Sequence, residues 1–313
     1  MPQPIDESSV PLWVFAVFAA SIGTWLYLVT LWLRRGTVLP YESRRPVPWA
    51  AWATLLAVLN VFVSVIISSR VEPERPIDSS AALNLALSVA TQLLFVSVFF
   101  FVVAIVSKAT RSDLGLPNSP RQLLYDVAIG VLACFAAYLP IAIVFELAVR
   151  LFGKPDLHPM IKQVKQHGDT LVLAIAFFSA VVVAPIVEEI IFRLLLQGWL
   201  EKWEDQLLGW RNTTEISDQL DLAWEGHNVA VATATPPEAG LGKMPYGSLP
   251  ILISSTLFAW AHIGHSIDPF PLFVLALFFG IIYQRTHRIV PCIVAHAIFN
   301  LVSMILFWQT QFK

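Results

Sequence analysis

Long apolar runs separated by short polar segments dominate the chain from end to end. A helix needs about 20 mostly apolar residues to cross a hydrocarbon core of about 30 Å, and eight segments reach or approach that length. They are residues 11–33, 48–69, 81–106, 123–152, 171–199, 248–263, 270–284 and 289–308, of which the sixth and seventh are short. This pattern predicts an all-α fold, a polytopic transmembrane helical bundle of about eight spans.

Composition supports a membrane protein and excludes other classes. Hydrophobic residues make up 57% of the chain and charged residues 13%, with a mean hydropathy of +0.68, which is outside the range of soluble domains. The 20 basic and 22 acidic residues nearly balance, so nothing indicates a nucleic-acid partner. The two cysteines, Cys134 and Cys292, lie in apolar segments and build no disulfide framework. We expect an integral, multi-pass membrane protein whose helices contact the lipid bilayer.

The positions of lysine and arginine predict the orientation, because these residues accumulate in cytoplasmic loops. The first, third and seventh loops hold Arg34, Arg35, Arg44, Arg45, Lys108, Arg111, Arg121, Arg285 and Arg288. These loops are predicted to face the cytoplasm, so both termini face outward. The fourth loop, with Arg150, Lys154, Lys162 and Lys165, favours the opposite orientation. The first apolar run follows a segment without basic residues, which is typical of a retained span rather than a signal peptide.

One sizeable polar segment, residues 201–246, interrupts the second half of the chain. It is acidic and rich in turn-forming residues toward its end, so we expect a short amphipathic helix followed by irregular structure. A solvated connection is the simpler interpretation, and a role in substrate gating or partner binding is the alternative. We divide the chain into N-terminal transmembrane helices, residues 1–169, and a core, residues 170–308, that carries this insert.

Three ionisable residues lie inside the fifth apolar segment, in the stretch "VVVAPIVEEIIFRLLLQGW". An ionisable residue at the bilayer centre costs about 2.5–3.5 kcal/mol on insertion scales and usually marks a functional site. Glu189 and Arg193 are four residues apart and can pair on one helical face. Glu188 is rotated by about 100° and stays available for chemistry. The alternative is that Arg193 extends to the interface and both glutamates serve the pair.

Polar residues also interrupt the sixth and last segments. His262 ends the sixth, and His296 and Asn300 lie four apart on one face of the last. With Glu188 they supply a general base, a polarising group and an oxyanion donor, the parts needed for hydrolysis by an activated water. A rise of about 1.5 Å per residue gives Glu188, His262 and His296 depths that differ by about 10 Å. Each histidine could instead be a hydrogen-bonded packing residue.

Three short stretches carry a family resemblance. "EEIIFR" (188–193), "FAWAH" (258–262) and "HAIFN" (296–300) resemble the three signatures of the CPBP family of intramembrane proteases, also called the CAAX-protease and bacteriocin-processing or Abi family. The resemblance covers residues 170–308 and implies a CAAX-protease-like core. It implies catalytic roles for Glu188, which activates water, for His262 and His296, and for Asn300 at the oxyanion, with Glu189 and Arg193 in support.

The resemblance leaves metal and substrate open. Glu188, His262 and His296 could form a three-ligand zinc site with an open position for water. No HExxH motif is present, and a glutamate-dependent mechanism, in which Glu188 would act without a metal, is also held for eukaryotic members of the family. The implied substrate is a membrane protein or a lipidated peptide, although the insert 201–246 departs from the family pattern. A bacterial plasma membrane is the favoured location.

The leading hypothesis is therefore an intramembrane endopeptidase that uses a glutamate- and histidine-activated water, with or without a metal. A multi-span transporter or proton-coupled carrier is the first alternative, because buried ionisable residues also form proton relays. Transporters often contain two related halves, and no internal repeat is visible in this sequence. The second alternative is a non-catalytic immunity or binding protein that keeps the polar cluster for structure, since a fold does not fix a function.

Overall fold

The computed structural model describes residues 11–42, 44, 47–70, 81–153, 170–207, 247–263 and 267–311. Within these ranges the regular structure is helical, without a strand, which confirms the all-α prediction. All eight predicted apolar segments are helical. The helices are α1 (Leu12–Arg35), α2 (Ala51–Arg70), α3 (Ala81–Val106), α4 (Pro120–Phe152), α6 (Thr170–Phe178), η1 (Ser179–Val183), α7 (Ala184–Glu189), η2 (Ile190–Gln197), α8 (Gly198–Leu207), α10 (Leu249–Trp260), α11 (Pro269–Thr286) and α12 (Val290–Gln311).

Among the described residues, six helical stretches are long and apolar enough to cross a membrane. They are Leu12–Arg35, Leu85–Val106, Pro120–Phe152, Thr170–Leu207, Pro269–Thr286 and Val290–Gln309. The other two predicted spans are apolar but shorter helices, Ala51–Ile66 and Leu249–Trp260. Large apolar side chains such as Leu26 and Phe101 are exposed on the outer helices, as contact with lipid requires. The chain is an integral membrane protein, as predicted.

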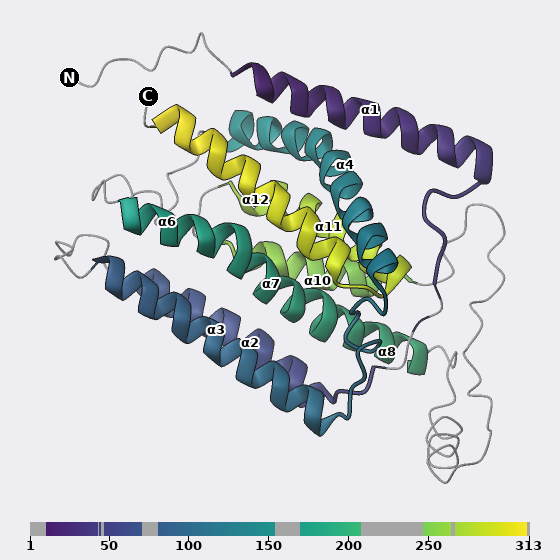
Figure 1. Cartoon of the computed structure of the whole chain (residues 1–313), viewed down its shortest axis with the longest axis vertical. Coiled ribbons are helices and arrows are strands. Elements are labelled where there is room, and N and C mark those ends of the chain that lie inside the picture. Colours follow the sequence, from purple (N-terminus) through teal and green to yellow (C-terminus); the bar gives the residue numbers. More distant parts are fainter. Residues whose placement is uncertain are drawn as a thin grey trace.

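The fifth span, which runs continuously from α6 to α8, lies in the middle of the bundle (Figure 1). On one side it contacts α2 and α3, and on the other it contacts α10, α11 and α12. Helix α4 packs against α11 and α12, and α1 covers α4 from outside. The ionisable residues of the fifth span are therefore surrounded by other helices rather than by lipid.

Glycines allow two of these helix pairs to approach closely. A Cβ atom on Gly130 of α4 would lie 2.7 Å from the carbonyl oxygen of Pro291 at the start of α12. A Cβ atom on Gly280 of α11 would lie 2.7 Å from a methyl carbon of Ile251 on α10. Small residues at such contacts let membrane helices pack backbone to backbone. The positions of α10 and α12 around the fifth span thus depend on these two glycines.

The fifth span adopts π-helical geometry twice, in η1 and in η2, on either side of Glu188 and Glu189. Pro185 has no backbone N–H to donate to the preceding turn, and η1 ends two residues before it. A π-turn inserts an extra residue, widens the helix and is frequent at functional sites. The two wide turns change the directions of the side chains between and after them.

Side chains from neighbouring helices donate to carbonyl oxygens of the wide turns. Asn300 of α12 donates to Ala180 at 2.8 Å, and Ser254 of α10 donates to Phe192 at 2.7 Å. From the α2 side, the indole Nε1 of Trp49 and the hydroxyl of Thr54 donate to Leu195 at 3.3 and 3.1 Å. Such donors satisfy backbone groups that irregular helices leave without intrahelical partners. The shape of the fifth span is therefore fixed by the helices around it.

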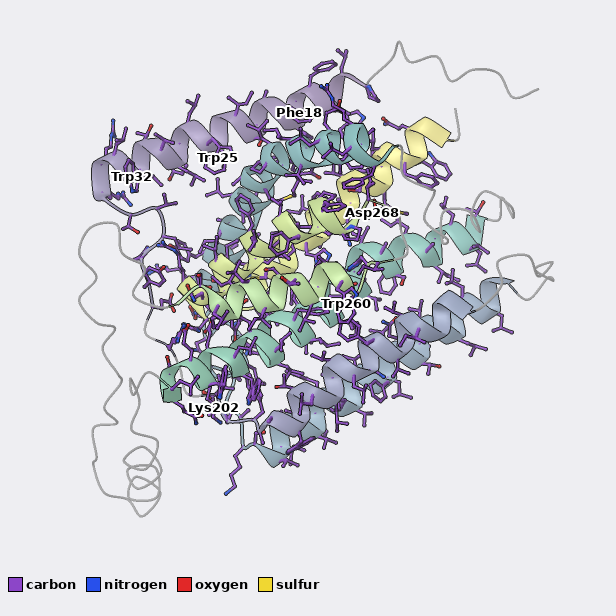
Figure 2. The ribbon with its side chains drawn as sticks, turned by 180° about the vertical axis from the view of Figure 1, so that it is seen from behind. Phe18, Trp25, Trp32, Lys202, Trp260 and Asp268 are labelled. Atoms are coloured by element: carbon purple, nitrogen blue, oxygen red, sulfur yellow. The ribbon has the colours of Figure 1, made fainter. Side chains whose placement is uncertain are left out.

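One end of the bundle carries a polar network that joins the connecting segments. Arg288 lies 2.9 Å from Glu42 and pairs with Asp126 of α4. The backbone N–H of Ile289 donates to the carbonyl of Gly115 at 3.1 Å. Figure 2 shows Trp32 and Lys202 toward this end and Asp268 away from it. This end gathers the first, third and seventh loops, which the sequence assigns together to one side of the membrane.

Arg44 forms the centre of the same network. Its buried guanidinium pairs with Glu204 at 2.7 Å, with Asp205, and with Glu201 at 3.7 Å, all on α8. Burial lowers the pKa of Arg44, but the carboxylates of Glu201 and Asp205 outweigh it and raise that pKa above its ordinary value. The first residues of the predicted insert, 201–207, are thus helical and partly buried. The remainder of the insert lies outside the described residues.

Candidate active site

Glu189 and Arg193 form the ion pair that their spacing predicts. The Nε atom of Arg193 donates to Oε2 of Glu189 at 3.2 Å, and both side chains are fully buried. Arg193 also lies over the rings of Phe258 and Phe279, at 5.6 and 6.0 Å from their centroids. A buried charge is stable only when it is paired and hydrogen-bonded. Arg193 therefore belongs to the bundle interior and does not extend to the interface.

His296 reaches this pair from α12. Its Nδ1 atom lies 2.9 Å from Oε1 of Glu189, the oxygen that does not bind Arg193. A carboxylate only accepts hydrogen bonds, so Nδ1 is the donor of this bond and Nε2 is the ring nitrogen that remains outside it. The His296 ring also stacks on Phe279, with centroids 5.3 Å apart, and meets Phe258 edge-on at 5.8 Å. Glu189 thus orients His296, a contact that no local sequence spacing predicts.

Glu188 points away from the ion pair, as its rotation on the helix predicts. Its side chain is 25% exposed, whereas that of Glu189 is fully buried. Oε2 of Glu188 lies 3.8 Å from Nε2 of His296, and this buried oxygen has no hydrogen-bond partner among the described residues. A separation above 3.5 Å is too long for a direct hydrogen bond and suits a bridging water. Glu188 is therefore the carboxylate left available for chemistry.

His262 lies just beyond the end of α10. Its Nδ1 donates to the carbonyl of Phe258 at 2.8 Å, which leaves Nε2 as the other ring nitrogen. The Phe258 ring contacts both histidines, since its centroid is 5.0 Å from that of His262 and 5.8 Å from that of His296. Within the described part of the chain, His262 makes no hydrogen bond or ion pair with Glu188 or His296. The two histidines are near each other but separated by an aromatic ring.

Asn300 lies one helical turn after His296 on α12, as predicted. One N–H of its amide donates to the carbonyl of Ala180 in η1. An amide nitrogen has two donors, so a second N–H remains for another acceptor. Asn300 thus supports the π-helical turn and keeps a second N–H that can donate elsewhere.

The predicted zinc set does not assemble within the described residues. No three His, Cys, Asp or Glu side chains in these ranges lie close enough together to hold a metal ion. Both rings use Nδ1 in other bonds, His296 with Glu189 and His262 with the carbonyl of Phe258, so Nε2 is the nitrogen that each ring would offer to a metal. Zinc stays a prediction. The cysteines Cys134 and Cys292 are free and buried, without a disulfide.

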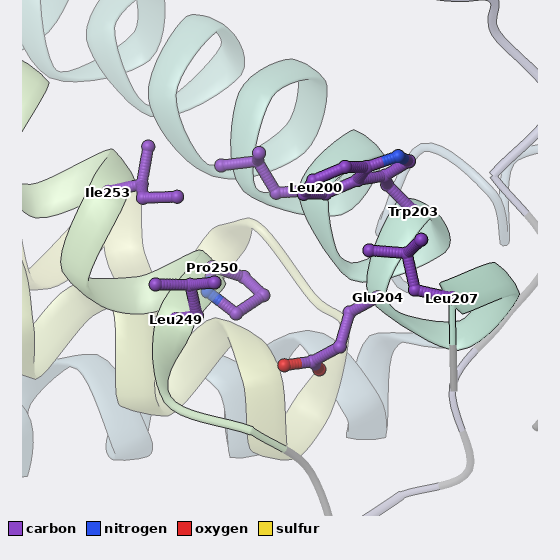
Figure 3. Close-up of a pocket in the computed structure, with 7 residues that line it drawn as sticks. All are labelled: Leu200, Trp203, Glu204, Leu207, Leu249, Pro250 and Ile253. Atoms are coloured by element: carbon purple, nitrogen blue, oxygen red, sulfur yellow. The ribbon is translucent and has the colours of Figure 1, made fainter.

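A groove between α8 and α10 lies apart from the polar centre. Figure 3 shows its lining side chains, Leu200, Trp203, Glu204, Leu207, Leu249, Pro250 and Ile253. Its volume is about 170 Å³, whereas pockets for small molecules usually have about 300–1,000 Å³. It contains no predicted site residue. The candidate active site is therefore the polar centre between α7, α10 and α12.

Sequence reasoning missed the residues that support this centre. Ser254, Thr54 and Trp49 are ordinary members of apolar spans, and nothing in their spacing sets them apart. Phe258 was visible only as the first residue of the second motif. A hydroxyl or indole within a span is a weak signal, because most such groups bond their own helix.

Comparison with protein families identifies a match to part of the chain. Residues 170–217 and 236–302 match the model of the family described as type II CAAX prenyl endopeptidase Rce1-like. This finding confirms the resemblance that the three motifs predict, because it is consistent with a CPBP-family intramembrane protease. The unmatched residues 218–235 fall inside the predicted insert. Comparisons with curated proteins and with solved structures returned no match.

Proposed function

Since the C-terminal part of the chain matches the Rce1-like family of membrane endopeptidases, we propose that it hydrolyses a peptide bond at the membrane through a water activated by Glu188. The observation that carries this proposal is the 3.8 Å separation of Glu188 Oε2 and His296 Nε2, two facing atoms without a direct bond. A water placed beside both atoms would bond each of them at ordinary length. The proposed substrate is a membrane protein or a lipidated peptide.

The proposed reaction starts with proton transfer from this water to Glu188. The oxygen of the water forms a bond to the carbonyl carbon of the substrate, and the carbonyl becomes an oxyanion. The free N–H of Asn300 donates to that oxyanion. His262, whose Nδ1 is bonded to Phe258, is the second polar group that we propose for the site. The C–N bond then breaks as Glu188 returns the proton to the leaving nitrogen. Atoms and charges balance without a further reactant.

His296 has a positioning and polarising role in this scheme. Its Nδ1 proton is held by Glu189, so Nε2 faces Glu188 in one fixed orientation. An oriented ring bonds the water on the side opposite to the substrate and limits the directions in which the water attacks. The burial of Glu189 and Arg193 keeps this arrangement rigid.

The direct test is cleavage of a fluorescent, farnesylated CAAX peptide by the purified full chain in lipid vesicles. Glu188→Gln should abolish cleavage, and His296→Ala should reduce it strongly, while Glu146→Gln should act like the wild type because that glutamate is exposed on α4. The thermal stability of each variant, measured in detergent, separates loss of chemistry from loss of fold.

A second arm identifies the natural substrate. New protein termini are compared, by mass spectrometry, in cells that express the wild type, Glu188→Gln or His296→Ala at equal levels. Termini that disappear in both variants would name the substrates. Cleavage of the farnesylated peptide alone would support a prenylated substrate. Equal termini in all strains, together with no cleavage of the peptide, would contradict the proposed function.

A further inference from the structure

A chain of hydrogen bonds connects α10 to the candidate catalytic residues. Ser254 of α10 contacts Arg193, Arg193 contacts Glu189, Glu189 contacts His296, and the free nitrogen of His296 faces Glu188. The donor–acceptor distances of its first three links are 3.1, 3.2 and 2.9 Å. The chain thus joins four helical segments, and Ser254 stands at its outer end.

The hydroxyl of Ser254 has a fixed direction. It donates to the carbonyl oxygen of Phe192 at 2.7 Å, which can only accept. Its oxygen is therefore free to accept, and Nη1 of Arg193 donates to it at 3.1 Å. Phe192 and Arg193 are consecutive residues of η2, so one hydroxyl holds both the backbone and the side chain at this wide turn. Ser254 is fully buried, so water does not compete for either bond.

Arg193 and His296 share their surroundings, so a displacement of one affects the other. The rings of Phe258 and Phe279 lie within 6.0 Å of the Arg193 guanidinium and within 5.8 Å of the His296 ring. Contacts with aromatic faces attract a cation but do not fix its rotation. The hydrogen bonds to Ser254 and Glu189 fix the rotation of the Arg193 guanidinium.

We infer that Ser254 is a positioning residue of the hydrolytic site: through Arg193 and Glu189 it sets the orientation in which His296 faces Glu188. The inference rests on the proposed function. Ser254 itself touches neither the water nor the substrate in this scheme. A purely structural role would be different, since Ser254 would then only satisfy a buried guanidinium and stabilise the fold.

The neighbouring Ser255 offers a matched control. It lies on the same helix and is equally buried, and its hydroxyl has no hydrogen-bond partner within the residues that the structure covers. Ser254→Ala and Ser255→Ala therefore each remove one hydroxyl oxygen from α10. Only Ser254→Ala also removes hydrogen bonds, those to Arg193 and Phe192. Ser254→Cys keeps a similar shape with a weak donor and acceptor, and Ser254→Thr restores the hydroxyl.

The experiment measures kcat and KM for the farnesylated peptide, and thermal stability, for the full chain in vesicles. Ser254→Ala should lower kcat about tenfold or more, as loss of an orienting partner does, while KM stays the same. Ser254→Cys should behave like Ser254→Ala, Ser254→Thr should recover activity, and Ser255→Ala should match the wild type. If Ser254→Ala fails to fold, the kcat of Ser254→Cys tests the inference in its place.

A second measurement, chemical labelling of His296, does not depend on catalysis. Diethyl pyrocarbonate modifies histidine nitrogens, and mass spectrometry of the intact protein's peptides gives the rate at His296. The rate should rise several-fold in Ser254→Ala and Ser254→Cys but not in Ser255→Ala, because a ring without its fixed partner is exposed more often.

The outcomes distinguish the inference from the function on which it rests. Lower kcat with faster labelling of His296 supports it. Unchanged kcat and labelling, or lower stability alone, overturns it. If the wild type cleaves no substrate, the proposed function fails, and the labelling rate still decides whether Ser254 positions His296.

Discussion

Oε1 of Glu189 accepts a hydrogen bond from Nδ1 of His296, while Oε2 of the same carboxylate accepts from Arg193. One buried side chain therefore neutralises a cation and orients an imidazole. Its neighbour in the sequence, Glu188, is partly exposed and faces the other nitrogen of the same ring. Two adjacent glutamates thus have different environments, and their substitution should have different consequences.

Replacement of Glu189 should destabilise the protein, whereas replacement of Glu188 should not. Glu189→Gln removes the charge partner of a fully buried arginine, and breaking a buried pair costs about 3–5 kcal/mol. Glu188→Gln removes no ion pair with Arg193 and should cost about 1 kcal/mol or less. The measurement is thermal or denaturant unfolding of both variants in the same detergent. Equal losses of stability would show that both glutamates serve the pair, which was the alternative interpretation of the sequence.

Thr54 should support the site from a part of the chain outside the family match. Thr54→Val keeps the side-chain shape but removes the hydrogen bond to the carbonyl of Leu195, so the loss of stability should be about 1 kcal/mol. The cleavage rate should fall as well, because η2 carries Arg193. Thr30→Val is the control, since that exposed hydroxyl bonds its own helix at Leu26. An unchanged unfolding midpoint for Thr54→Val would contradict this role of α2.

Much of the fold follows from the sequence, because membrane thickness sets the length of an apolar helix. The Glu189–Arg193 pair also follows, since four-residue spacing is local information. The contact between Glu189 and His296 joins residues that are 107 positions apart and depends on how α12 packs on α7. The π-helical turns leave no trace in hydropathy, which does not depend on hydrogen-bond register. The Arg44 network was missed because its arginine was counted only as a loop charge.

Arg44 should be essential for the end of the bundle that it occupies. Arg44→Ala leaves Glu201 and Asp205 without their buried cation, and the expected loss is about 3–5 kcal/mol. Arg150→Ala is the matched control, because its pair with Glu146 is exposed and such pairs contribute about 0.5 kcal/mol or less. Unfolding of both variants in detergent gives the comparison. A small effect of Arg44→Ala would mean that α8 is held by its apolar contacts alone.

Asp268 should make stability depend on pH. Burial raises the pKa of this carboxyl above its ordinary value, although nearby His262 acts in the opposite direction. The folded state therefore binds the proton more tightly than the unfolded chain, so stability is lost as the pH rises through the folded-state pKa. Asp268→Asn cannot ionise, and its melting temperature should exceed that of the wild type at neutral pH. The difference should shrink as the pH falls toward the ordinary pKa, and a constant difference would contradict the assignment.

Metal dependence can be tested separately from the fold. The described residues do not gather Glu188, His262 and His296 into a ligand set, so we expect 1,10-phenanthroline to leave cleavage unchanged. Metal analysis of the purified protein by mass spectrometry provides the second measurement. Stoichiometric zinc together with inhibition by the chelator would instead establish the three-ligand site that the family resemblance leaves open.

The contacts of the wide turns of the fifth span can form only in stages while the chain is synthesised. Their carbonyl groups bind donors from α2, which is synthesised earlier, and from α10 and α12, which are synthesised later. A nascent chain that ends before residue 290 lacks His296 and the amide that holds η1. The proposed hydrolytic centre is therefore completed only when the last helix enters the bilayer, and under the proposed function a partly synthesised molecule should not cleave its neighbours in the membrane.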